Sequence, residues 1–185
     1  DDPAYYPGTT VLRNIPDIRN ADTLVEFELE SYTRRSVQPL PDGNFNVEHY
    51  CAVHQHLFQD VYEWAGRYRT IRIAKGGNPF CYPEYIGAQM LTVFARLDQP
   101  ALMPGTTTEA FIPAIADFLA ELNAVHPFRE GNGRTQLIFL SMLGLGAGLS
   151  FRLESIEPEE FLRAMIDSFH GRLDALTDEL ERMLA

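Results

Sequence analysis

Nine consecutive residues in the second half of the chain combine side chains that can move a phosphate group: His126-Pro127-Phe128-Arg129-Glu130-Gly131-Asn132-Gly133-Arg134. His126 has the ordinary pKa that suits a general base at neutral pH. Glu130 offers one carboxylate for a Mg²⁺ ion that also contacts phosphate oxygens. Arg134 adds a permanent cation whose planar geometry matches phosphate. Together these groups predict phosphoryl or nucleotidyl transfer.

The glycine-rich centre of this segment predicts an anion-binding turn. Gly131, Asn132 and Gly133 are residue types that accept positive φ, and successive N–H groups in such a turn converge on an anion. The helix expected to follow adds free N–H donors and the positive end of its dipole. Phe128 is expected to be buried and to fix the loop. The alternative is an ordinary turn with a solvated Glu–Arg pair, but the complete nine-residue pattern favours a site.

The surrounding sequence predicts a mainly α-helical fold of about seven helices. Pro127 favours the end of the preceding helix at Val125 or His126. Asp22 is expected to cap the first helix, and the second is expected to start at Asn46 and end at Gly66. Residues 134–144 are apolar almost all round, which is typical of a central buried helix. Other helices are expected over about 83–97, 108–125, 158–170 and 173–184.

One small β-hairpin is expected over residues 68–82. Tyr68 to Ile73 alternate in polarity, and Gly76-Gly77-Asn78 is typical of a tight turn. Lys75 and Gly76 could contact a nucleotide from this hairpin, and the alternative is an ordinary turn. Residues 1–16 are expected to form an extended arm. We therefore expect one domain over 1–185, with the active-site loop and helix start at 126–137.

Composition excludes several classes of protein. The net charge of −11 argues against a nucleic-acid binder and against a polybasic membrane anchor. The apolar stretch Leu137 to Leu149 is shorter than the ~20 residues that a membrane span needs, and no secretory leader is apparent. Cys51 and Cys81 form no metal spacing, so a reducing cytoplasm is the expected location.

The segment 126–137 closely resembles the signature of the Fic family, HxFx(D/E)GN(G/K)RxxR. The resemblance extends to Leu57–Gly66 (LFQDVYEWAG) and to Tyr6-Pro7-Gly8, and so covers nearly the whole chain. It implies the helical Fic fold, in which the hairpin is a flap that holds the target segment as an added strand. It also implies an enzyme that transfers AMP from Mg-ATP to a hydroxyl side chain of a target protein and releases pyrophosphate. The alternatives are a weak or inactive binding module with this fold, or transfer of another phosphate-containing group.

The resemblance assigns a role to each residue of the motif. His126 resembles the base that deprotonates the target hydroxyl, and Glu130 resembles the Mg²⁺ ligand. Gly131, Asn132 and Gly133 match the anion hole for the α- and β-phosphates, and Arg134 resembles the β-phosphate contact. Relatives with Lys in place of Gly133 can act as kinases, so this glycine favours AMP transfer. Gln136 is a further candidate nucleotide contact.

The last Arg of the signature is replaced by Leu137. In the family that Arg contacts the γ-phosphate and pairs with an inhibitory Glu. With Leu at this position, the alternatives are that activity is lower, that other groups bind the end of the nucleotide, or that the enzyme is no longer inhibited. The inhibitory motif (S/T)xxxE(G/N) is absent, as in stand-alone Fic toxins and effector modules. In several of those a small antitoxin supplies the inhibitory helix. The resemblance thus leaves two locations open, the bacterial cytoplasm or, for an effector, a host cell.

Overall fold

The computed structural model describes residues 3–185, and within them seven α-helices and one two-stranded antiparallel hairpin. The helices are α1 (Ala21–Ser36), α2 (Val47–Phe58), α3 (Ile86–Phe94), α4 (Thr108–Val125), α5 (Asn132–Ala147), α6 (Pro158–Phe169) and α7 (Asp174–Met183). The expected mainly helical fold is therefore confirmed. No helix of the described part of the chain is long and apolar enough to cross a membrane.

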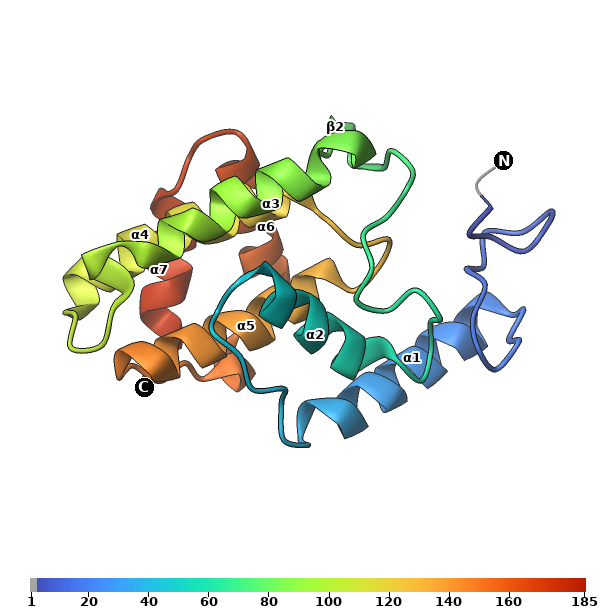
Figure 1. Cartoon of the computed structure of the whole chain (residues 1–185), viewed down its shortest axis with the longest axis horizontal. Coiled ribbons are helices and arrows are strands. Elements are labelled where there is room, and N and C mark those ends of the chain that lie inside the picture. Colours follow the sequence, from blue (N-terminus) through green and yellow to red (C-terminus); the bar gives the residue numbers. More distant parts are fainter. Residues whose placement is uncertain (1–2) are drawn as a thin grey trace.

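The core lies around α4 and α5. Helix α4 packs against α3, α5, α6 and α7, while α5 also packs against α2. Their inward faces carry fully buried rings, among them Phe111, Phe118 and Phe139. Helix α1 lies at one edge of the molecule beside α2, with the N-terminal loop beyond its start and the C-terminus at the opposite end (Figure 1).

Helix boundaries follow capping chemistry. The α1 N-cap is Asn20, whose side chain accepts a hydrogen bond from the N–H of Thr23, so the expectation of Asp22 as the cap was wrong. Asn46 caps α2 in the same way, as expected. The α2 helix ends at Phe58, however, and the chain continues in turns to Gly66, whose φ is +79°. The apolar repeat predicted a longer helix because Val61 and Tyr62 are buried, but these residues lie in turns rather than in a helix.

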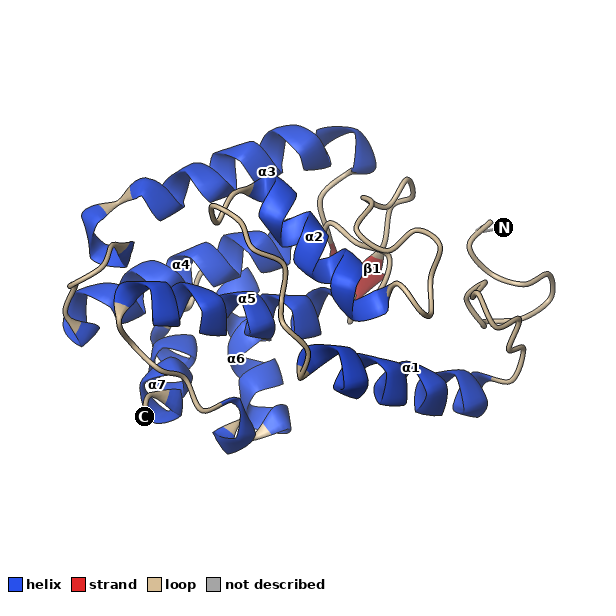
Figure 2. Cartoon of the chain, turned by 60° about the horizontal axis from the view of Figure 1, so that its bottom comes forward, coloured by secondary structure: helices blue, strands red, loops and turns tan. Residues whose placement is uncertain are grey.

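The hairpin is shorter than expected, with strands β1 (Ala74–Lys75) and β2 (Asn78–Pro79) joined by Gly76 and Gly77. Both glycines have positive φ, which a two-residue turn between antiparallel strands requires. The expected strand over 68–73 is absent from the described structure because the buried Arg69 bends that segment around its own hydrogen bonds. In Figure 2, β1 lies among the loops beside α2.

From residue 3 to residue 16 the chain turns back on itself rather than forming the expected extended arm. The expected arm begins with Asp1 and Asp2, which lie outside the described residues. Within the described part, a bridge joins Tyr5 to Leu12, and the N–H of Tyr6 donates to the carbonyl of Val11 at 3.0 Å. Tyr6, Val11 and Leu12 are buried, so this loop packs onto the rest of the molecule.

Candidate active site

Arg69 fixes the end of α4, where the candidate base His126 lies. Its guanidinium is buried and donates to four backbone carbonyls: those of His126 at 2.8 Å, Val125 at 3.1 Å, and Ile71 and Cys81 at 2.6 Å each. The carbonyls at the end of a helix have no partner inside the helix, so Arg69 satisfies groups that would otherwise be orphaned. Through these hydrogen bonds, residues on both sides of the hairpin are joined to the loop that begins at His126.

The His126 ring is held between the hairpin segment and the loop. His126 is the C-cap of α4 and has a positive φ of 49°. Its ring stacks on Phe80, with centroids 3.9 Å apart, and its Nδ1 is buried without a hydrogen-bond partner. The pKa of His126 is lowered to about 4, mainly by burial and also by the nearby cations Arg69 and Lys75, while the backbone of Asn123 acts in the opposite direction. The ring is therefore neutral at neutral pH and free to accept a proton.

Asn132 and Phe128 close the loop on itself. The Asn132 side chain accepts a hydrogen bond from the N–H of Phe128 at 2.9 Å and donates one to its carbonyl at 2.8 Å. The Phe128 ring is fully buried and stacks on His54, with centroids 3.7 Å apart. The side chain of Asn132 thus shapes the loop, and only its backbone N–H remains available to a ligand.

His54 supports the loop from α2, a contact that sequence reasoning did not find. Its Nδ1 accepts a hydrogen bond from the N–H of Gly66 at 2.8 Å, so the proton lies on Nε2, which donates to the carbonyl of Glu130 at 2.9 Å. Burial lowers the pKa of His54 to about 4, which keeps the ring neutral. Because its partners are 12 and 76 residues away, no local pattern could reveal this role.

The anion-binding feature is the start of α5 rather than a turn of three residues with positive φ. Of the three central residues only Gly131 has positive φ, at +81°, while Asn132 and Gly133 already belong to the helix. The N–H of Thr135 makes the first helical bond, to the carbonyl of Gly131. The N–H groups of Asn132, Gly133 and Arg134 are therefore left open at the positive end of the helix dipole. The expectation of a three-residue nest was wrong because the helix starts immediately after Gly131.

Glu130 lies at the mouth of this site. Its carboxylate accepts a hydrogen bond from the N–H of Gly131 at 2.9 Å and lies 3.6 Å from Nη2 of Arg134, and its side chain is 47% exposed. No group of three or more metal-binding side chains occurs among the described residues. A metal ion here would therefore rely on one carboxylate and on oxygens of a bound phosphate, which is how Mg²⁺ is commonly held.

One cavity of about 640 Å³ collects most of the predicted site residues. Its lining includes Lys75, Gly76, His126, Glu130, Asn132, Gly133, Arg134 and Gln136. Gly131 and Phe128 are not part of this lining. The Nε2 of Gln136 is buried without a partner, which leaves a donor for a ligand. Leu137 also lines the cavity, where the signature has Arg.

The opposite wall of this cavity comes from α6 and was not predicted. It is formed by the apolar side chains Phe161, Leu162, Met165, Ile166 and Phe169. Leu162 and Ile166 are 49% and 45% exposed, so this apolar face is partly open at the cavity. The sequence pattern of α6 does not distinguish this face from one that is buried in the core, because the face comes close to the site only when the chain folds.

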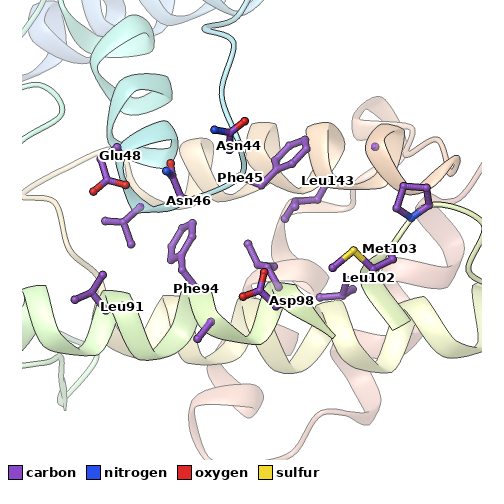
Figure 3. A pocket seen from close by; sticks show the side chains of 15 residues that line it. Asn44, Phe45, Asn46, Glu48, Leu91, Phe94, Asp98, Leu102, Met103 and Leu143 are labelled. Carbon is purple, nitrogen blue, oxygen red and sulfur yellow. The ribbon is translucent and has the colours of Figure 1, made fainter. Parts of the chain in front are cut away.

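A second cavity, of about 440 Å³, lies between the start of α2, the end of α3 and the end of α5. Figure 3 shows Phe45, Phe94, Leu102 and Leu143 around it, with Glu48 and Asp98 at its polar positions. Within the described structure its lining holds no histidine, lysine or arginine. It therefore lacks a cation for phosphate and a histidine base, so the candidate active site is the cavity at the start of α5.

A neutral histidine, an open helix start and an arginine lie on one cavity, and these groups suit a phosphate-bearing ligand. The chain belongs to the Fic/DOC family, whose sequence profile matches residues 44–143. It is 50% identical to a probable protein adenylyltransferase of Sinorhizobium fredii, over 100% of this chain and 96% of that protein. It is 33% identical to a probable protein adenylyltransferase of Salmonella typhimurium, over 95% of this chain and 88% of that one.

A solved structure agrees with this family assignment. The effector protein BepC from Bartonella tribocorum, described with bound AMPPNP, superposes with a TM-score of 0.88 at 25% identity, covering 98% of this chain and 96% of that chain. The expected Fic fold is therefore confirmed.

Proposed function

We propose that this chain is a protein adenylyltransferase, which moves AMP from Mg-ATP to a hydroxyl side chain of another protein. The observation that carries the proposal is the single cavity that joins His126, the open first turn of α5 and Arg134. The probable adenylyltransferases that resemble the chain over nearly their whole length support it. Fic-fold modules that only bind would not need a neutral base beside the phosphate site.

The nucleotide phosphates bind at the start of α5. The open N–H groups of Asn132, Gly133 and Arg134 and the guanidinium of Arg134 receive them. Gly133 lacks a side chain, and nothing lies within 4 Å of the point where its Cβ would be, so phosphate oxygens can approach the backbone. Gln136 adds its free amide donor, and the apolar α6 wall accepts the base. Lys75 and Gly76 contact the ligand from the hairpin.

Glu130 would hold the Mg²⁺ ion, for which its exposed carboxylate beside the phosphate site is suited. When bound, the ion neutralises phosphate charge and orients the phosphates. The N–H of Gly131 donates to Oε1 of this carboxylate, which leaves the other carboxylate oxygen for an ion.

His126 takes the proton from the target hydroxyl. Because its Nδ1 is buried, Nε2 is the nitrogen that a substrate reaches. The hydroxyl oxygen forms a bond to the α-phosphorus, the bond from that phosphorus to the bridging oxygen of the β-phosphate breaks, and pyrophosphate leaves. The proton moves to Nε2 of His126, and Arg134 and the α5 donors stabilise the charge on the phosphates.

The target segment docks on the hairpin. Both strands have a free edge, since the sheet in the described structure contains only β1 and β2, and Ala74 and Lys75 are exposed. An added strand would place a hydroxyl near His126, because the segment after β2 carries Phe80 against the His126 ring.

The location and control of the enzyme belong to the same proposal. It acts in the bacterial cytoplasm as a toxin held by a small antitoxin, or in a host cell as an effector. The Bartonella neighbour, described as a VirB-translocated effector protein, supports the second setting.

The test is labelling of a lysate with ATP that carries label at either the α- or the γ-phosphate. Compared with a lysate that contains the His126→Ala variant, protein should acquire additional α-label and no additional γ-label. Additional transfer of γ-label would show a kinase and would overturn the proposal. Labelled bands identified from bacterial and host lysates would then separate the two settings.

A further inference from the structure

Arg134 is paired across the fold with Glu28, which lies 106 residues earlier on α1. The Nη2 of Arg134 donates to one carboxylate oxygen of Glu28, and the hydroxyl of Tyr62 donates to the other. The Glu28 side chain is only 12% exposed, and that of Arg134 is 28% exposed. Burial and the charge of Glu28 raise the pKa of Tyr62, so its hydroxyl stays a donor.

Two aromatic rings lie near the guanidinium of Arg134. Its central carbon lies 4.8 Å from the ring centroid of Phe58 and 5.4 Å from that of Tyr32, distances at which a cation is attracted to a ring. The bonds to Glu28 and the contact with Glu130 both use Nη2. Among the described residues, Nε and Nη1 of Arg134 have no hydrogen-bond partner. Two nitrogens of a fixed guanidinium, with three N–H groups between them, therefore remain for a ligand.

We propose that Glu28 is a positioning residue for AMP transfer, which holds Arg134 in the orientation that receives the nucleotide phosphates. The inference rests on the proposed function, in which Arg134 contacts phosphate. Arginine has a long side chain with several free torsions, and orienting it before the substrate arrives removes that cost from the reaction. Tyr62 in turn fixes the carboxylate, so α1 and the turn after α2 both support a residue of the catalytic loop.

The opposite role would be inhibition, with Glu28 occupying Arg134 in place of phosphate. Two observations favour positioning. The carboxylate is nearly buried, and a buried charge that loses its partner is strongly disfavoured, so the pair should persist when a nucleotide binds. The pair also leaves Nε and Nη1 free, so phosphate need not displace Glu28.

The variant that tests this role is Glu28→Gln, which keeps the shape and removes the charge. It should lower kcat for AMP transfer by about 10-fold or more and weaken Mg-ATP binding, because a misplaced catalytic group can lose ~10²-fold in rate. Glu30→Gln on the same helix is the matched control, since Glu30 is exposed. Glu28→Asp keeps the charge and should recover part of the lost kcat, and Tyr62→Phe should give a smaller loss of the same kind.

A double-mutant cycle with Arg134→Ala separates positioning from general damage to the fold. If Glu28 acts through Arg134, Glu28→Gln should cost far less kcat in the Arg134→Ala background. Equal losses in both backgrounds, or a Glu28→Gln variant that transfers AMP as fast as or faster than the parent, would overturn the inference. The same double-mutant cycle can be measured as Mg-ATP affinity by calorimetry, and this measurement does not require AMP transfer. A parent that binds Mg-ATP with this coupling but labels no protein would refute the adenylyltransferase, while Glu28 would still orient Arg134 toward the nucleotide phosphates.

Discussion

The ring of His126 lies almost parallel to the ring of Phe80, with an interplanar angle of 13°. Phe80 follows strand β2, so the hairpin segment covers the candidate base directly. This contact contributes to the burial that lowers the pKa of His126 to about 4. The segment expected to receive the target protein thus also contributes to the protonation state of the group that would deprotonate it.

The acid limit of activity should lie near pH 4 to 5 rather than near pH 6.5. His126 can accept a proton only when neutral, so kcat should fall as the pH falls through its lowered pKa. Phe80→Ala exposes the ring and should move this limit toward pH 6.5, whereas Phe80→Leu should move it less. The measurement is kcat at saturating Mg-ATP across pH 4 to 8. A parent profile that loses half its rate at pH 6.5 would contradict the neutral, buried base.

Removal of the base should abolish transfer and leave nucleotide binding. His126→Ala should lower kcat by about 10²–10⁴-fold, the usual range for a general base. Mg-ATP affinity by calorimetry should change little, because the phosphate donors belong to α5 and Arg134. A folded variant that retains full AMP transfer would remove His126 from the mechanism.

Gly131→Ala should destabilise the protein, whereas Gly133→Ala should not. The φ of Gly131 is +81°, and a Cβ there would lie 2.5 Å from the Phe58 ring. Strain at such a position typically costs about 1–3 kcal/mol. Gly133 lies in the helix with open space around it, and alanine in a helix is favoured over glycine by about 0.5–1 kcal/mol. Melting temperatures of the two variants provide the comparison, and equal values would contradict this account of the loop.

Leu137→Arg should tighten ATP binding without unfolding the protein. Leu137 lines the active-site cavity and is only half-buried, so a longer cationic side chain can reach the ligand. A charge-assisted hydrogen bond contributes roughly 1.5–3 kcal/mol. ATP affinity and melting temperature should be measured together. An early-melting variant with unchanged affinity would show that position 137 belongs to the core rather than to the site.

The stability of the protein should fall with pH below about 6.5 partly because of His54. Burial lowers the pKa of His54 to about 4, so between pH 6.5 and 4 the unfolded chain binds the proton that the folded chain refuses. Each pH unit in this window then removes up to about 1.4 kcal/mol from the free energy of unfolding. Urea unfolding at pH 7 and pH 5 should show a smaller loss for His54→Gln than for the parent. An equal loss would mean that other groups carry the pH dependence.

The sequence by itself determined the helical class, the position of the hairpin turn and the chemistry of the segment 126–134. These features are local: an apolar repeat, two adjacent glycines and nine consecutive residues each act over a short stretch of chain. The same local reasoning extended α2 to Gly66 and proposed a strand over 68–73, and both were wrong. Val61 and Arg69 are buried although neither lies in a helix or strand. A repeat in the sequence cannot distinguish such burial from that of a residue on the inner face of a helix or strand.

Only the tertiary structure decided how the motif is supported. His54 reaches the carbonyl of Glu130, Arg69 reaches that of His126, and Glu28 reaches Arg134, over separations of 76, 57 and 106 residues. The apolar α6 wall joins the cavity in the same way. Such partners leave no periodic signal, because a hydrogen bond between distant segments requires only that each residue be in the right place once the helices pack. The motif supplies the candidate reacting groups, and the packing of α1, α2 and α6 around it sets their orientation, protonation and access to a ligand.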